Sequence, residues 1–134
     1  MKRLIPFCTA IAFLLIACEE EVPDPNFDLR DDYTGSWVVE ENSNFFGAQA
    51  YAVEVSKSDT SDTEIWVSNF YGLGSSTNTS MNVVDNSLVI PLQTVSGSDI
   101  SGTGQSDLDV TSISFTYGVD DGSGVDNCTA TWTR

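Results

Sequence analysis

The chain of 134 residues contains no histidine, and only five lysines and arginines stand against 20 aspartates and glutamates. Without imidazole, histidine-based zinc and haem sites and the Ser–His–Asp or Cys–His forms of catalysis are excluded. The shortage of cations argues against nucleic-acid binding, which depends on neutralising phosphates with basic side chains. No glycine-rich loop opens a helix, so no phosphate-binding cradle is predicted. We expect no enzymatic activity, no cofactor and no metal.

A single extended hydrophobic run opens the chain. Lys2 and Arg3 precede a mostly apolar stretch over residues 4–17. A membrane-spanning helix needs about 20 apolar residues, whereas this shorter arrangement is typical of a secretory signal peptide. The stretch ends in Leu15-Ile16-Ala17-Cys18, which resembles the lipobox of bacterial lipoproteins. The resemblance implies cleavage before Cys18, a lipid on its thiol, and membrane anchoring through palmitate-like acyl chains.

Three glutamates, Glu19-Glu20-Glu21, follow the lipobox directly. An acidic cluster at this place resembles the surface-export signal of Bacteroidota-type lipoproteins. It implies an outer-membrane lipoprotein that faces the cell surface, with the periplasmic face as the alternative. Cleavage before Cys18 leaves 117 residues with all 20 acids and three of the five cations, hence a net charge of −17. Such a charge disfavours any peripheral grip on anionic headgroups and leaves the lipid as the membrane contact.

The three cysteines do not predict a disulfide. Cys8 leaves with the signal peptide and Cys18 is lipidated, so Cys128 has no partner in the mature chain. Cys128 lies in an alternating strand pattern and is expected to be a small buried hydrophobic residue. A catalytic thiolate would need an activating base such as the histidine that the chain lacks.

Residues 1–17 are predicted to form the signal peptide, 18–31 a lipidated, flexible, acidic tether, and 32–134 a single β-domain. The domain consists of short apolar–polar alternations separated by clusters of Gly, Asn, Asp and Ser, the pattern of strands and turns. We expect turns or loops at 58–62, 85–86 and 120–124. No stretch of the domain has a sustained helical period, although residues 41–48 could hold a turn of helix. The predicted strands are 35–41, 49–57, 63–70, 79–85, 87–93, 98–105, 110–119 and 126–133.

The alternation assigns the faces of the strands. Ile113, Phe115, Tyr117 and Val119 share one face, while serines, a threonine and a glycine share the other. About eight such strands joined by short turns predict an all-β, roughly eight-stranded antiparallel up-and-down barrel, with a two-sheet β-sandwich as the alternative. An outer-membrane barrel would turn its apolar face outward, which alternation alone does not distinguish. The lipid anchor and the acids at strand positions favour a domain surrounded by water.

The first predicted strand opens with Gly35-Ser36-Trp37. Gly-x-Trp at this place resembles the opening motif of lipocalins and the wider calycin group, and the whole chain resembles small Bacteroidota-type lipoproteins with a lipocalin-like domain. The resemblance implies that Trp37 closes the narrow end of the barrel and that a basic residue of the last strand packs across it. Arg134 is the candidate for that residue. The alternative is a tryptophan that fills an unrelated β-core.

The aromatic residues Phe45, Phe46, Trp66, Phe70 and Tyr71 are the candidates for contact with a ligand or partner. Trp66 and Phe70 have the opposite parity to Ile65 and Val67, so one of these sets should face away from the core. The lipocalin resemblance implies non-enzymatic binding of a small apolar ligand in the barrel mouth. Exposed aromatics would instead suit an interaction module for a glycan or a protein, and a structural envelope lipoprotein is the third interpretation.

Acidic residues near the last turn allow one metal hypothesis. Asp120, Asp121 and Asp126, with Asn127 nearby, could supply oxygen ligands to calcium. Their spacing does not follow the twelve-residue calcium-binding loop, so a hairpin turn is the favoured interpretation.

Overall fold

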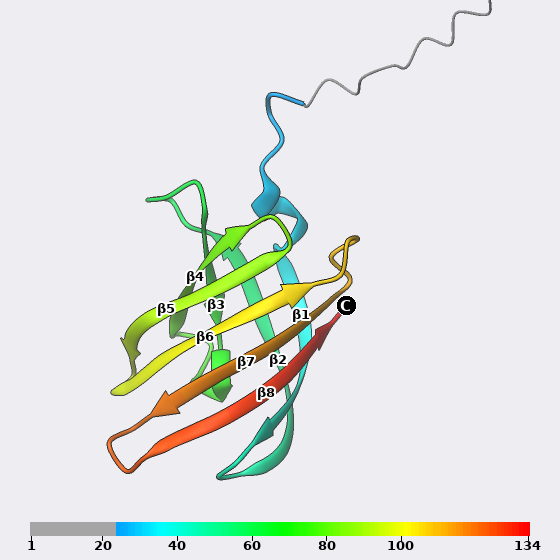
Figure 1. Cartoon of the computed structure of the whole chain (residues 1–134). Coiled ribbons are helices and arrows are strands. Elements are labelled where there is room, and N and C mark those ends of the chain that lie inside the picture. Colours follow the sequence, from blue (N-terminus) through cyan, green and yellow to red (C-terminus); the bar gives the residue numbers. More distant parts are fainter. Residues whose placement is uncertain (1–23) are drawn as a thin grey trace, which may run out of the picture.

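The computed structural model describes residues 24–134; the signal peptide, Cys18 and the acidic cluster lie outside this range. Eight antiparallel strands follow one another around a closed barrel, each paired with its neighbours in sequence, and β1 pairs with β8 (Figure 1). The closure confirms the up-and-down barrel and excludes the sandwich. The strands are β1 (Gly35–Ser43), β2 (Gly47–Lys57), β3 (Glu64–Ser68), β4 (Asn78–Val84), β5 (Ser87–Val95), β6 (Ser98–Ser106), β7 (Ser112–Asp120) and β8 (Val125–Thr133).

Each predicted strand is present, with its ends within two residues of the predicted ones. The apolar face points inward: Ile113, Phe115, Tyr117 and Val119 are all buried, and the residues between them are exposed or half-buried. An inward apolar face is the arrangement of a barrel in water rather than in lipid. Residues 41–48, which could have held a helical turn, instead continue β1 to Ser43 and form a tight turn that leads into β2.

The interior of the barrel is filled by side chains. The ring of Trp132 lies 4.5 Å from that of Phe115 and 6.3 Å from those of Trp37 and Phe70, between ring centroids. Phe70 in turn lies 4.7 Å from Tyr117. These aromatic rings, together with the aliphatic residues around them, form one core cluster of buried side chains.

Two glycines of β6 leave room for this core. A Cβ at Gly104 would lie 2.4 Å from the ring of Phe115, and one at Gly102 would lie 2.4 Å from the Cβ of Tyr117. Small residues on one strand therefore accommodate large rings on the next, which is how a narrow barrel reaches close packing.

The predicted boundary of the domain at residue 32 needs a correction. A short 3-10 helix, η1 (Leu29–Asp32), precedes β1, and Leu29 packs against the core. The side chain of Arg30 is buried and donates to the carbonyl oxygens of Ser58, Ser61 and Glu64 at 3.0, 2.7 and 3.1 Å. The carboxylate of Asp28 holds the same guanidinium at 2.8 Å. Residues 28–31, which the sequence assigns to the tether, belong to the domain.

Strand β5 contains an irregularity at Pro91. The register between β5 and β6 shifts between Ile90 and Gln93, where proline lacks the N–H that a regular ladder needs. The side-chain amide of Gln93 replaces backbone pairing toward β4: its oxygen accepts from the N–H of Ser80 at 2.9 Å, and its nitrogen donates to the carbonyl of Ser80 at 2.8 Å. The Gln93 side chain thus links β5 to β4 at the irregularity.

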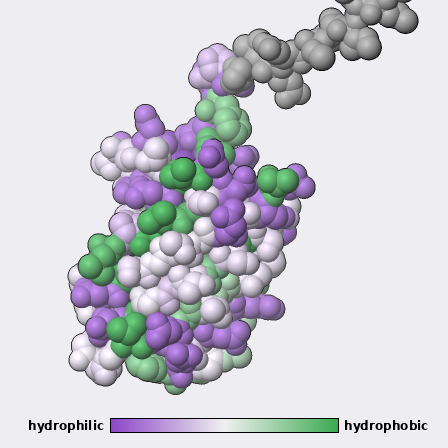
Figure 2. All heavy atoms as spheres, in the orientation of Figure 1, coloured by the Kyte–Doolittle hydropathy of each residue, from purple (hydrophilic) through white to green (hydrophobic). Residues whose placement is uncertain are grey.

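The outer surface is mixed. On the face shown in Figure 2, apolar atoms form separate patches among polar ones. Within the described residues, no helix is both long and apolar enough to cross a membrane.

Candidate functional site

The two ends of the barrel differ. The described chain enters the barrel at the top of Figure 1. At this end Arg134 lies over the indole of Trp37, with its guanidinium carbon 4.3 Å from the ring centroid. The same guanidinium donates to the carbonyl oxygens of Thr34, at 2.9 Å, and Asp32. Trp37 is buried and its Nε1–H donates to the carbonyl of Tyr33 at 2.8 Å. Trp37 and Arg134 meet as the Gly35-x-Trp37 motif implies, and we call this the closed end.

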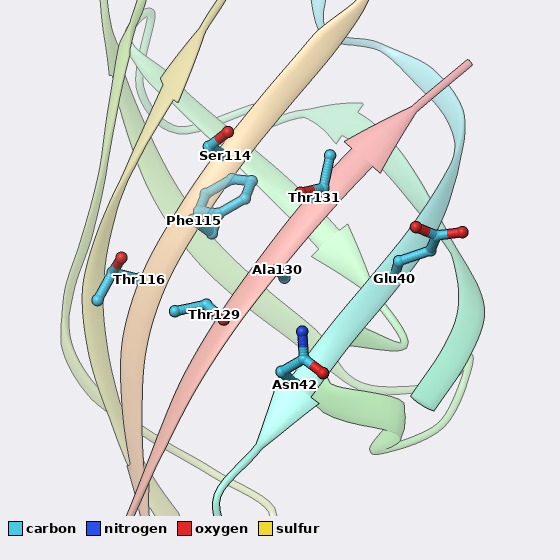
Figure 3. Close-up of a pocket in the computed structure, with 8 residues that line it drawn as sticks. All are labelled: Glu40, Asn42, Ser114, Phe115, Thr116, Thr129, Ala130 and Thr131. Carbon is cyan, nitrogen blue, oxygen red and sulfur yellow. The ribbon is translucent and has the colours of Figure 1, made fainter. Parts of the chain in front are cut away.

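The outer wall carries shallow grooves but no convergent site. One of about 290 Å³ runs across β1, β8 and β7 (Figure 3). The strand registers align its outward side chains in two rows, Glu40–Thr131–Ser114 and Asn42–Thr129–Thr116. Short hydroxyl side chains exposed along a flat sheet are solvated by water, so this groove is the ordinary wet face of an antiparallel sheet.

At the opposite end of the barrel, which we call the mouth, loops converge on a recess of about 190 Å³. Phe45 and Phe46 come from the β1–β2 turn and stay 52% and 65% exposed. Other segments complete the lining: η2 (Phe70–Gly72) and the residue after it, the start of β6, the end of β7, the β7–β8 turn and the start of β8. The recess is lined by Phe45, Phe46, Tyr71, Leu73, Ser98, Val119, Asp121 and Asp126.

Asp126 is the buried carboxylate of the recess, with 1% of its surface exposed. Its Oδ2 accepts from the hydroxyls of Ser43 and Tyr71, both at 2.5 Å, and its Oδ1 accepts from the N–H of Phe45 at 3.1 Å. Burial alone would favour the neutral acid, but these hydrogen bonds outweigh it and hold the pKa of Asp126 below its usual value. Asp126 therefore carries a negative charge in a site with little water contact.

A second carboxylate, Glu41, lies deeper in the barrel. It is 2% exposed, and its Oε2 accepts from the hydroxyls of Tyr51, at 2.6 Å, and Tyr117. Within the described residues, its Oε1 has no hydrogen-bond partner. Burial, reinforced by the charge of Asp126, raises the pKa of Glu41. The pKa values of the two carboxylates thus shift in opposite directions, so Glu41 takes up a proton more readily than Asp126 does.

Tyr71 joins the two carboxylates. Its hydroxyl donates to Asp126, while its backbone N–H donates to the hydroxyl of Tyr51 at 3.1 Å. Its φ of 57° places it in the left-handed region, as does the φ of 61° at Asn69, and such a conformation is costly for a bulky residue. The side chain of Asn69 holds the turn, since it donates to the carbonyl of Ala52 at 2.8 Å and accepts from the N–H of Gly74 at 3.0 Å. The fold therefore fixes the Tyr71 ring at the mouth.

The structure separates the five aromatic candidates. Phe45, Phe46 and Tyr71 meet at the recess. Phe70 is buried in the core, and Trp66 is half-buried on the outer wall, where its Nε1–H donates to Glu64 at 3.1 Å. Ile65 and Val67 are the inward pair of β3.

Sequence reasoning missed Glu41 as a site residue and considered Asp126 only as a calcium ligand. Both occupy inward positions of strands whose other inward residues are mostly apolar. An acidic residue at a position where the alternation predicts an inward apolar side chain is the signal that could have identified both.

The calcium hypothesis does not match the geometry. The carboxylates of Asp120 and Asp121 accept from the backbone N–H groups of Gly122 and Ser123 at 2.9 and 3.0 Å, as in an ordinary turn. Of the four residues, Asp121 and Asp126 line the recess, and Asp120 and Asn127 do not. The described residues contain no cluster of three or more His, Cys, Asp or Glu side chains suited to a metal ion.

Cys128 is buried, as expected for a small hydrophobic residue. Burial, with the charges of Asp126 and Glu41, raises the pKa of the Cys128 thiol to about 12. The thiol is therefore protonated at neutral pH and is a poor nucleophile.

Comparison with known proteins supports the fold alone. No family model and no curated protein matches the chain. Among solved structures, the chain is similar to a redesigned β-barrel, with a TM-score of 0.57 and 12% sequence identity over 80% of this chain and 95% of that one. At such low identity the likeness extends to the barrel architecture and to nothing beyond it.

Proposed function

We propose that this protein is a membrane-anchored outer-membrane lipoprotein, without enzymatic activity, whose barrel binds a partner at its mouth. The observation that carries the proposal is the recess between Phe45 and Phe46, beside a barrel interior filled by buried rings. Half-exposed phenylalanines on a turn that the fold holds in place are typical of interaction surfaces. The exposed phenylalanines beside a filled interior therefore support an interaction module.

A small apolar ligand inside the barrel is the weaker alternative. Binding sites for drug-sized ligands have volumes of roughly 300 to 1,000 Å³, whereas the recess measures about 190 Å³ and is partly polar. The rings of Trp37, Trp132 and Phe70 occupy the space that a larger apolar ligand would need. Native mass spectrometry of the protein purified from its host separates the two functions, because a co-purified apolar molecule would favour the interior site.

The docking function is tested by crosslinking in living cells. A photo-crosslinking aromatic amino acid replaces Phe46 at the mouth or, as the matched control, Leu108, which is 89% exposed in the loop between β6 and β7 at the other end. We expect a discrete adduct from position 46 that is absent from position 108. The adduct should weaken with Phe45→Ala and persist with Phe27→Ala, a residue 62% exposed on the tether side. Equal adducts at both positions, or none at position 46, would refute the proposal.

The anchor is tested separately. Cys18→Ser removes the thiol that the lipobox resemblance assigns to the lipid, and it should move the protein from the membrane fraction to the soluble fraction. If the variant stays with membranes after washing at high salt, the anchor proposal is wrong. This result does not bear on docking at the mouth, because the two proposals concern different parts of the chain.

A further inference from the structure

The described cations all lie at the closed end. Lys57 contacts Asp31 at 2.6 Å and Asp28 at 3.5 Å, Arg30 pairs with Asp28, and Arg134 lies over the Trp37 indole. Asp121 and Asp126 line the recess at the other end, where none of these basic side chains reaches. Charge complementarity therefore points to a partner that brings a cation to the mouth.

Asp126 strengthens this inference because it is both charged and buried. A carboxylate 1% exposed is rarely found without an opposite charge, yet its donors are two neutral hydroxyls and one backbone N–H. These donors keep it ionised without cancelling its charge. Low-dielectric walls around one sign of charge focus the field into a recess and raise the local concentration of counter-charged groups.

The walls of the recess suit an organic cation. Phe45, Phe46 and Tyr71 present aromatic rings to it, and the face of such a ring attracts an ammonium or guanidinium group. Leu73 and Val119 add apolar surface against which an alkyl stem can pack. A hydrated inorganic ion gains nothing from these apolar walls.

The hydrogen bonds of Asp126 favour an ammonium over a guanidinium. Arginine binds best through a two-pronged contact with both carboxylate oxygens. On Asp126, Oδ2 already accepts two hydroxyls and Oδ1 already accepts the N–H of Phe45. One further acceptor direction on Oδ1 remains, which suits a single N–H donor on a compact charge.

We propose that the mouth binds a lysine side chain presented by a partner protein, with the ammonium group between Asp126 and Asp121 and the alkyl stem against Phe45 and Phe46. The inference rests on the proposed docking function and names the chemistry of its occupant. A partner protein is favoured over a free amine because the ring of Phe46 remains 65% exposed and offers apolar surface beyond the recess to the residues that flank the lysine.

The test titrates the detergent-solubilised full-length protein with three probes. The first is a blocked peptide, Gly-Leu-Lys-Leu-Gly; the second is the same peptide with Nε-acetyl-lysine; the third is n-butylamine, a free amine with the stem of lysine. We expect saturable binding of the lysine peptide that weakens several-fold between low and high salt, with at least tenfold weaker binding of the other two probes.

Variants locate the binding. Phe46→Leu keeps the site apolar but removes the aromatic face, and it should weaken the lysine peptide about two- to fivefold. Asp121→Asn removes a charge at the exposed rim and should weaken it by a similar factor. Phe27→Leu, the same substitution on the tether side, should leave the affinity unchanged. Since none of these three side chains is buried, folding should be retained.

Other outcomes would overturn the inference. Equal binding of the acetyl-lysine peptide, or no saturable binding of the lysine peptide, would show that the mouth does not recognise a lysine ammonium group. The crosslinking experiment would still decide separately whether the mouth docks a partner. Equal binding of n-butylamine would assign the site to free amines. Effects of Phe27→Leu as large as those of Phe46→Leu would place the peptide elsewhere.

Discussion

Replacing Phe70 with alanine tests whether the barrel interior is filled. Phe70 is 1% exposed and its ring lies between those of Tyr117, at 4.7 Å, and Trp132, at 6.3 Å. It also fixes η2, the segment that carries Tyr71 to the mouth. The substitution removes a ring from the centre of the core and leaves a cavity that the rigid barrel wall cannot collapse into.

The structure sets the expected magnitude. A buried Phe→Ala change costs about 3 to 5 kcal/mol, and the loss of two aromatic contacts, each worth about 0.5 to 1.5 kcal/mol in favourable geometry, places Phe70 in the upper part of that range. For a domain of this size, 1 kcal/mol corresponds to about 4 °C or slightly more in Tm. We expect Phe70→Ala to lower Tm by roughly 15 to 25 °C, and Phe27→Ala, on an exposed ring, to change it by no more than about 2 °C.

Thermal unfolding with and without benzene measures both the loss and the cavity. An apolar cavity of this kind stays dry and binds a small aromatic molecule, and benzene at 100 times its Kd would restore about 2.7 kcal/mol. Benzene should therefore raise the Tm of Phe70→Ala and leave that of the unaltered protein unchanged. If benzene stabilises the unaltered protein as much as the variant, the interior already holds a cavity and the reasoning is wrong.

Three further predictions concern other parts of the fold. Arg30→Lys should lower Tm, because a lysine cannot satisfy the set of carbonyl and carboxylate acceptors that the guanidinium contacts. An unchanged Tm would mean that residues 28–31 do not stabilise the domain and are part of the tether. Gln93→Ala should cost about 1 to 3 kcal/mol in urea unfolding through the two lost hydrogen bonds to Ser80, and an effect within error would show that the β4–β5 seam needs no bridge. The raised pKa of Glu41 means that its contribution to stability is present below its unfolded pKa of about 4.3 and is lost as the pH rises through its folded pKa. Glu41→Gln should therefore gain stability relative to the unaltered protein as the pH rises above about 4.3, and a parallel dependence of the two stabilities on pH would contradict the assignment.

The strand plan follows from the sequence because the period-two signal of an antiparallel barrel is local. Alternation along β7 places Ile113, Phe115 and Tyr117 inward without reference to any other strand. The Gly35-x-Trp37 motif likewise led to Arg134, because the resemblance supplies a long-range pairing that alternation cannot. Closure of the barrel, in contrast, depends on pairing between β1 and β8, which no local pattern encodes.

The failures have a common physical cause, the loss of strand periodicity. Parity along the chain groups Phe70 with Trp66, but β3 ends at Ser68 and the left-handed conformation of Asn69 breaks the alternation before Phe70, which is buried in the core. Arg30 lies in a charged, proline-containing stretch that reads as a tether. Its burial follows from carbonyl oxygens of the β2–β3 loop and β3, about 30 residues further along the chain, which need a donor. Neither effect leaves a local signature.

The point at which the chain enters the barrel determines which end of the domain faces away from the proposed membrane anchor. Residues 24–28 reach the barrel at the closed end, beside η1 (Figure 1). The recess of Phe46 and Asp126 is formed by loops at the other end. Strands of nine residues rise about 3.3 Å per residue and tilt by roughly 40° in a barrel, so the two ends lie about 20 to 25 Å apart. If Cys18 is lipidated as proposed, the tether approaches from the closed end and the acidic recess is presented away from the membrane. A partner then meets the recess first, and the carboxylates of Asp121 and Asp126 that line it would attract a cationic group on the surface of the partner.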